Sequence, residues 1–137
     1  MYKELDNYLL GYLPMDYWYD EGFSIAREIL SNFTQEDWEE LANNISSKTL
    51  DYQRKLAYSI ENSGREYELS VLLSMTNTED RELFEICIDS LREFINTENK
   101  HLFVKNEAIL NHINRAMPNA DRTTKNMYKD FLDKTNK

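Results

Sequence analysis

The chain has 137 residues, about the length of one domain, and it carries a formal net charge of −9. Its single cysteine, Cys87, excludes an intrachain disulfide, and no stretch approaches the ~18 uncharged apolar residues that mark a membrane span. Because the N-terminus also lacks the basic start and apolar run of a signal peptide, we expect a cytoplasmic protein with no membrane segment.

The distribution of charge is more informative than its total. Residues 1–98 contain 21 Asp and Glu against 8 Lys and Arg, a net charge of −13, whereas residues 99–137 carry +4. A body of this charge repels phosphate backbones and attracts basic proteins, so we expect no direct binding of nucleic acid. The positive segment has no dense basic run, and we interpret it as a solvated helix face.

The expected structure is helical along almost the whole chain. Only 3 Gly and 2 Pro occur, too few for the turns of a sheet protein, and apolar residues recur with helical spacing. The first helix is expected to end at Gly11 and Pro14. Thr34, with Asp37 at the N3 position, is the clearest helix start, and Thr49 is expected to cap the next helix.

Later turns are marked in the same way. Gly64 supplies a turn residue that can adopt a positive φ, Pro118 stops the seventh helix and Asp121 begins the last. The expected helices cover, in order, about residues 3–12, 19–32, 34–45, 49–61, 65–75, 79–95, 100–117 and 121–133. Among the inward-facing residues assigned to them are Leu5, Leu9, Phe23, Ala26, Trp38, Leu41, Ala42, Ile45, Leu72, Leu83, Phe84, Leu91, Phe103, Ile113 and Phe131.

Helices joined by such short polar turns must pack antiparallel. Three hairpins result, over residues 34–62, 64–96 and 99–133. The sequence therefore predicts a single all-α domain, residues 1–137, formed by a stack of antiparallel helical hairpins with seven to eight helices. A HEAT-like α-solenoid and an irregular helix bundle remain alternatives.

No pattern of a catalytic or cofactor site occurs. His101 and His112 share one face of an expected helix but lie about 16 Å apart along its axis, too far to bind one metal ion. Cys87 lies in an apolar stripe, which predicts a buried and inert thiol. Nucleotide, hydrolase and calcium-binding motifs are missing, and the many carboxylate pairs are typical of a solvated face. We expect no enzyme activity, no metal and no cofactor.

One cluster of aromatic and acidic residues stands out near the N-terminus, where residues 12–23 read YLPMDYWYDEGF. Because three of its rings are consecutive, at least one points outward. Exposed aromatics among acids are typical of an interface with a basic partner, whereas the alternative is a cluster that caps the core. The candidate partner-binding residues are Asp16, Tyr17, Trp18, Tyr19, Asp20 and Glu21, with Tyr12 in the same cluster.

A second group of similar composition surrounds the turn between the fourth and fifth helices. Its members are Asp51, Tyr52, Glu61, Glu66 and Tyr67, and they could extend the same acidic-aromatic surface. Tyr52 also falls on the apolar stripe of its helix, and for this residue a core position is favoured.

The stretch from Thr34 to Phe94 resembles small acidic α-helical immunity proteins of bacterial toxin systems, including contact-dependent growth inhibition. The residues that carry the resemblance are TQEDWEEL at 34–41, YQRKLAYSIEN at 52–62 and LSVLLSMTNTEDRELFEICIDSLREF at 69–94, the last of which also looks like a HEAT-type repeat. The resemblance implies a cytoplasmic protein, monomeric when free, that binds one cognate toxin domain 1:1 and covers its active site or substrate surface. Such toxins are often basic nucleases.

The charge of the chain agrees physically with this expectation. A nuclease must expose positive charge to hold phosphates, and an acidic body can mimic that polyanion and speed the encounter. The alternative function is a helical-repeat adaptor or regulatory module with an unrelated partner. A third class, a small enzyme or a metal-binding bundle, has the least support in the sequence.

Overall fold

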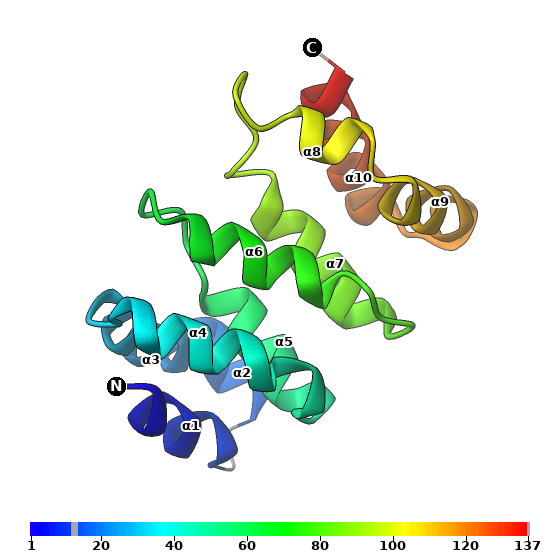
Figure 1. Ribbon diagram of the computed structural model, residues 1–137. Coiled ribbons are helices and arrows are strands. Elements are labelled where there is room, and N and C mark those ends of the chain that lie inside the picture. Colours follow the sequence, from blue (N-terminus) through cyan, green and yellow to red (C-terminus); the bar gives the residue numbers. More distant parts are fainter. Residues whose placement is uncertain (12–13, 137) are drawn as a thin grey trace.

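The computed structural model describes residues 1–11 and 14–136, and within them it contains helices and no strand (Figure 1). The predicted all-α class is therefore confirmed. The α-helices are α1 (Tyr2–Leu10), α2 (Met15–Tyr17), α3 (Phe23–Ser31), α4 (Gln35–Asn44), α5 (Leu50–Ser59), α6 (Glu66–Met75), α7 (Arg81–Leu91), α8 (His101–Val104), α9 (Glu107–Ala116) and α10 (Arg122–Asn136). Shorter turns are the π-helical η1 (Trp18–Gly22) and the 3₁₀-helical η2 (Ile45–Ser47) and η3 (Met117–Asn119).

The local start and stop signals act as predicted. The Thr34 hydroxyl accepts a hydrogen bond from the Asp37 backbone N–H at 3.2 Å, and the Asp37 carboxylate accepts one from the Thr34 N–H at 2.9 Å, a complete capping box. Thr49 caps α5 by accepting from the Tyr52 N–H at 3.2 Å. Gly64 has a φ of 91°, the conformation expected of a turn glycine.

Three predicted helices differ clearly from the structure. The sixth, expected to reach residue 95, ends at Leu91. The second begins earlier, at Met15, and passes through η1 into α3 as one helical segment. The seventh is divided into α8 and α9, because the Asn106 side chain accepts a hydrogen bond from the Ile109 N–H at 3.1 Å and caps a new helix. As a result, His101 and His112 lie on different helices, so the prediction that they share one helix face is wrong.

The helices pack in two layers around α7. Helices α3, α5, α7 and α10 contact one another in that order, and α4 and α6 lie side by side in front of α5 and α7 in Figure 1. Helices α5, α6 and α10 all pack against α7, whose inward residues Leu83, Phe84, Cys87 and Leu91 are completely buried. This arrangement leaves part of α7 open on the side where α5 and α10 flank it.

The N-terminal part of the core is built around Trp18. Its ring is completely buried, and its indole N–H donates to the Lys55 carbonyl oxygen of α5 at 3.1 Å. A Cβ at Gly22 would lie 2.8 Å from the Trp18 ring, so this glycine permits the close packing of η1. Ala42, assigned to the core from the pattern, is exposed, because α4 buries a stripe that includes Trp38 and Leu41 but stops short of this position.

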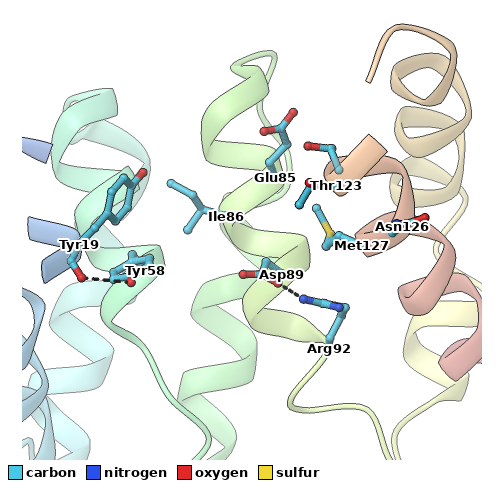
Figure 2. Close-up of a pocket in the computed structure, with 10 residues that line it drawn as sticks. Tyr19, Tyr58, Glu85, Ile86, Asp89, Arg92, Thr123, Asn126 and Met127 are labelled. Atoms are coloured by element: carbon cyan, nitrogen blue, oxygen red, sulfur yellow. Dashed lines mark hydrogen bonds and ion pairs between the residues drawn. The ribbon is translucent and has the colours of Figure 1, made fainter. Parts of the chain in front are cut away.

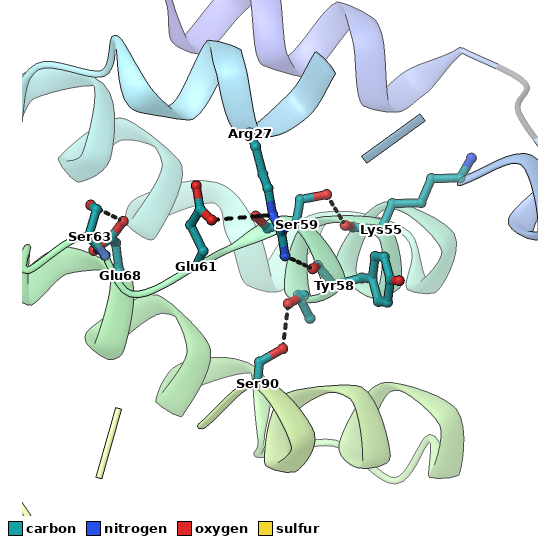
Figure 3. Close-up of polar contacts among 9 residues, drawn as sticks. Arg27, Lys55, Tyr58, Ser59, Glu61, Ser63, Glu68 and Ser90 are labelled. Atoms are coloured by element: carbon teal, nitrogen blue, oxygen red, sulfur yellow. Dashed lines mark hydrogen bonds and ion pairs between the residues drawn. The ribbon is translucent and has the colours of Figure 1, made fainter. Parts of the chain in front are cut away.

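Two arginines donate hydrogen bonds to backbone carbonyl oxygens at the C-terminal ends of neighbouring helices. Arg27 of α3 donates to the carbonyl oxygens of Ser59, at 3.0 Å, and Tyr58, at 3.5 Å, at the end of α5 (Figure 3). Arg65 donates in the same way to three carbonyl oxygens at the end of α3, those of Leu30, Ser31 and Phe33. Both guanidinium groups satisfy backbone acceptors that the helix ends leave open, and so they are held by the protein's own backbone.

Candidate partner-binding groove

A groove runs along the open side of α7. Its first hollow has a volume of about 450 Å³ and lies between η1 and α5 on one side and α10 on the other (Figure 2). This hollow is lined by Tyr19, Tyr58, Glu85, Ile86, Asp89, Arg92, Thr123, Thr124, Asn126 and Met127. A second hollow of about 630 Å³ shares Tyr58, Asp89 and Arg92 with the first and adds Arg27, Ile60, Glu61, Asn62, Ser90, Glu93 and Phe94. We call the two together the α7 groove.

One wall of the α7 groove is aromatic. The rings of Tyr19 and Tyr58 pack edge to face with centroids 4.7 Å apart, and Phe23 packs on Tyr58 at 5.4 Å. The Tyr19 hydroxyl donates to Glu82 at 3.2 Å, and burial together with the charge of Glu82 raises the pKa of Tyr19 to about 12. Tyr19 is therefore neutral at physiological pH and packs as part of this aromatic wall.

The middle of the groove is acidic, and its two carboxylates on α7 differ. Asp89 pairs with Arg92, which also pairs with Asp130 of α10 at 3.1 Å. Glu85, one turn away, is half-buried and makes no hydrogen bond or ion pair with any other described residue. Burial raises the pKa of the Glu85 carboxyl, so its charge is poorly solvated where it stands.

The carboxylates as a group are not neutralised internally. Among the described residues, nine ion pairs engage eight of the 25 Asp and Glu side chains. Most cations of residues 1–98 are already engaged within the molecule, including Lys48 with Asp6 at 2.8 Å and Lys55 with Asp51 at 2.8 Å. The negative field expected from the sequence therefore remains available at the surface.

Two of the predicted partner-binding residues are corrected by the structure. Trp18 and Tyr52 are both completely buried, so neither side chain is available to a partner in this fold. Trp18 is held by the Lys55 carbonyl, and the Tyr52 hydroxyl donates to Asp6 at 3.0 Å. From the sequence, a core position was one of two alternatives for Trp18 and the favoured one for Tyr52. The structure supports a core position for both residues.

The other predicted residues are divided among three places. Tyr19 and Glu61 line the α7 groove. Tyr67 lies on α6, with its hydroxyl donating to Glu39 of α4 at 3.5 Å, and so it belongs to the opposite layer. Residues that are exposed but do not line the groove are Asp16, Tyr17, Asp20, Glu21, Asp51 and Glu66. Tyr12 lies outside the described residues.

Several groove residues were not predicted from the sequence. Tyr58, Ile86 and Met127 give the groove its apolar surface, and Glu85 gives it an unpaired charge. Tyr58 and Ile86 are apolar or aromatic residues that fall outside the core stripes of α5 and α7. Such residues off the stripe were the available signal, since an apolar side chain that the core does not need is free to line a binding surface.

His112 and Cys87, two of the residues considered for metal or thiol chemistry, pack against other side chains of the protein. His112 stacks on Phe84 with ring centroids 3.6 Å apart, and burial, followed by the charge of Arg115, lowers its pKa. Cys87 is completely buried, as predicted, and burial raises the pKa of its thiol to about 12. Within residues 1–11 and 14–136, no three His, Cys, Asp or Glu side chains gather as ligands of one metal ion.

Comparison with known proteins adds no relative. No family model matches the chain, and no curated protein and no solved structure matches it. In the part of the chain that the structure describes, no helix combines the length and the apolar composition that crossing a membrane requires.

Proposed function

We propose that this protein is an immunity-type inhibitor that binds a basic toxin domain, with a nuclease as the favoured class, and covers its active site or substrate surface. The observation that carries the proposal is the α7 groove, where an aromatic wall, an unpaired carboxylate and a concave surface occur together. It is a better candidate contact surface than the consecutive aromatics near the N-terminus, because Trp18 among them is buried.

The charge supports the choice of a basic partner. An excess of unpaired carboxylates attracts a positively charged protein over about one Debye length, roughly 8–10 Å at physiological salt. That attraction raises the association rate but contributes little to the lifetime of a complex. A long-lived complex also requires packed contacts, and Tyr19, Tyr58 and Met127 supply aromatic and apolar surface within the same groove.

The test begins with the product of the adjacent upstream gene, where an immunity protein's toxin is expected. The purified toxin domain should form a 1:1 complex with this protein and lose its activity in that complex. The association rate should fall by at least about tenfold between 20 and 500 mM salt, because screening removes the attraction between exposed charges. A rate that stays constant with salt would contradict the electrostatic part of the proposal.

The same experiment separates the alternative function. A helical-repeat adaptor would bind a partner without abolishing an activity of that partner. Formation of a complex in which the toxin domain remains fully active would therefore contradict inhibition and favour the adaptor.

A further inference from the structure

We infer that the first hollow of the α7 groove receives an arginine side chain of the partner, with its guanidinium group on Glu85 and its methylene stem along Tyr58 and Met127. This inference rests on the proposed function, since it names the chemical group by which the basic partner is recognised. The residues involved come from α5, α7 and α10, and Figure 2 shows them around one hollow.

The first argument is the unequal pairing of the carboxylates around the groove. Glu61 lies 3.9 Å from Arg27, Asp89 pairs with Arg92, and Glu82 lies 3.6 Å from Arg54 and accepts from the Tyr19 hydroxyl. Glu85 and Glu93 have no such partner among the described residues, and of these two Glu85 is half-buried whereas Glu93 is exposed. A poorly solvated carboxylate without a partner is stabilised by an incoming cation more than a solvated one is.

The second argument is the charge that surrounds Glu85. Two charged residues of α7 act on Glu85. The positive charge of Arg81 favours the ionised form of Glu85, and the negative charge of Glu82 disfavours it. From the start of α10 it faces Asp121, a third carboxylate, and the buried hydroxyl of Tyr128 lies on the same helix. Carboxylates therefore outnumber cations around this group, so the hollow attracts positive charge from outside.

The third argument concerns shape, and it favours a guanidinium over an ammonium group. A guanidinium is planar, stacks on aromatic faces and reaches a carboxylate with two N–H groups at once. The protein already uses this contact close by, since the guanidinium of Arg27 lies 4.7 Å above the ring of Phe23, which packs on Tyr58. Tyr58 and Met127, with Ile86 in the same hollow, supply apolar surface for the methylene stem.

The direct test uses the free protein and three small probes. N-acetyl-arginine methylamide is titrated into isotopically labelled protein, and the side-chain carboxyl signal of Glu85 and the ring signals of Tyr58 are followed by NMR. We expect saturable shifts of both. N-acetyl-citrulline methylamide, which has nearly the same shape but no charge, should cause none. Equal shifts with the arginine and citrulline probes, or no shifts with the arginine probe, would overturn the inference. The third probe is N-acetyl-lysine methylamide, and its binding as tightly as the arginine probe would overturn the choice of guanidinium.

The test in the complex compares two matched substitutions. Glu85→Gln should accelerate dissociation of the toxin domain by about tenfold, the loss of one charge-assisted contact, whereas Glu66→Gln on the exposed start of α6 should change it less than about twofold. Equal dissociation rates for the two variants would overturn the inference while leaving inhibition of the toxin intact. If no toxin domain binds at all, the proposed function fails, and the probe titration still decides whether the hollow holds a guanidinium.

Discussion

The protein carries two similar tyrosine–glutamate pairs on opposite layers, and they differ in what surrounds them. The Tyr19 hydroxyl donates to Glu82 at 3.2 Å beside the α7 groove, and the Tyr67 hydroxyl donates to Glu39 at 3.5 Å across α4 and α6. The first pair borders a hollow with further aromatic and apolar side chains, whereas the second pair lines none of the hollows described here. Composition is nearly the same at the two places, but only the first pair borders the α7 groove.

The difference separates two contributions that an acidic surface can make to binding. Exposed carboxylates such as Glu39 act at a distance and are screened by salt. A hollow that already excludes part of the water makes each contact stronger, because the charges in it have less hydration to lose. We therefore expect the α4–α6 face to affect the association rate and the α7 groove to affect the dissociation rate.

The largest expected effect is on stability. It tests whether the buried ring of Trp18 anchors η1, the segment that brings Tyr19 to the groove. Trp18→Ala removes a completely buried ring next to Tyr19 and should lower the free energy of unfolding by about 3–5 kcal/mol, as large core truncations do. Urea unfolding followed by circular dichroism measures this loss. Tyr17→Ala, at the exposed neighbouring position, is the control and should cost about 1 kcal/mol or less. Similar losses for the two variants would mean that Trp18 does not anchor η1.

The next effect concerns binding and compares the two layers directly. Tyr58→Ala should weaken binding of the toxin domain by at least about 2 kcal/mol, because it removes the aromatic residue that both hollows share. Tyr67→Ala on the other layer should weaken it by less than about 0.5 kcal/mol. Both are measured by calorimetry on protein shown to be folded. If Tyr67→Ala has the larger effect, the contact surface lies on the α4–α6 face.

Features that depend on neighbouring residues could be predicted from the sequence. The capping box of Thr34 and Asp37, the cap at Thr49 and the turn at Gly64 each involve atoms within a few residues of one another. The Asn106 cap that divides the seventh predicted helix belongs to the same class. Its signal, an asparagine directly before an acidic first turn, was present in the sequence but not used.

The candidate site could not be predicted, because it depends on long-range packing. Tyr58, Glu85 and Met127 lie on three helices, and only their packing around α7 brings them together. The consecutive rings near the N-terminus show the same limit. The π-helical register of η1 and a carbonyl of α5 decide that Trp18 faces the core while Tyr19 lines the groove, and neither can be read from local spacing.

A smaller effect tests the support of Glu82, the carboxylate of the Tyr19 pair, which lies 3.6 Å from Arg54. Asp80 caps α7 by accepting from the Leu83 N–H at 2.8 Å and holds Arg54 through two hydrogen bonds. Asp80→Ala should lower the free energy of unfolding by about 1–2 kcal/mol, whereas Asp80→Asn, which keeps a capping side chain, should lower it less. Thermal and urea unfolding measure both. Equal losses would show that the contact with Arg54, and not the cap, stabilises the start of α7.

The pH dependence of the same site has a defined sign. Hydrogen bonding to Arg54 lowers the pKa of the Asp80 carboxyl in the folded protein. Its stabilising contribution is therefore complete above its ordinary pKa and is lost as the pH falls through the lowered value. The free-energy difference between the wild-type protein and Asp80→Asn should shrink over that acidic range and should not change between pH 6 and 8.

The smallest effect has the opposite sign and applies to Glu85, the half-buried unpaired carboxylate of the groove. Because burial raises the pKa of Glu85, its ionised form is less stable in the folded protein than in the unfolded chain, and this cost is present at neutral pH. Glu85→Gln should therefore unfold at a slightly higher urea concentration than the wild-type protein at pH 7. The advantage should shrink as the pH falls through the raised pKa and should disappear below the ordinary pKa of a glutamate.

Glu66→Gln, on the exposed start of α6, should show no such gain. A Glu85→Gln variant less stable than the wild-type protein at pH 7 would mean that the protein itself already compensates this charge, and the groove would then have no need of a cation from a partner.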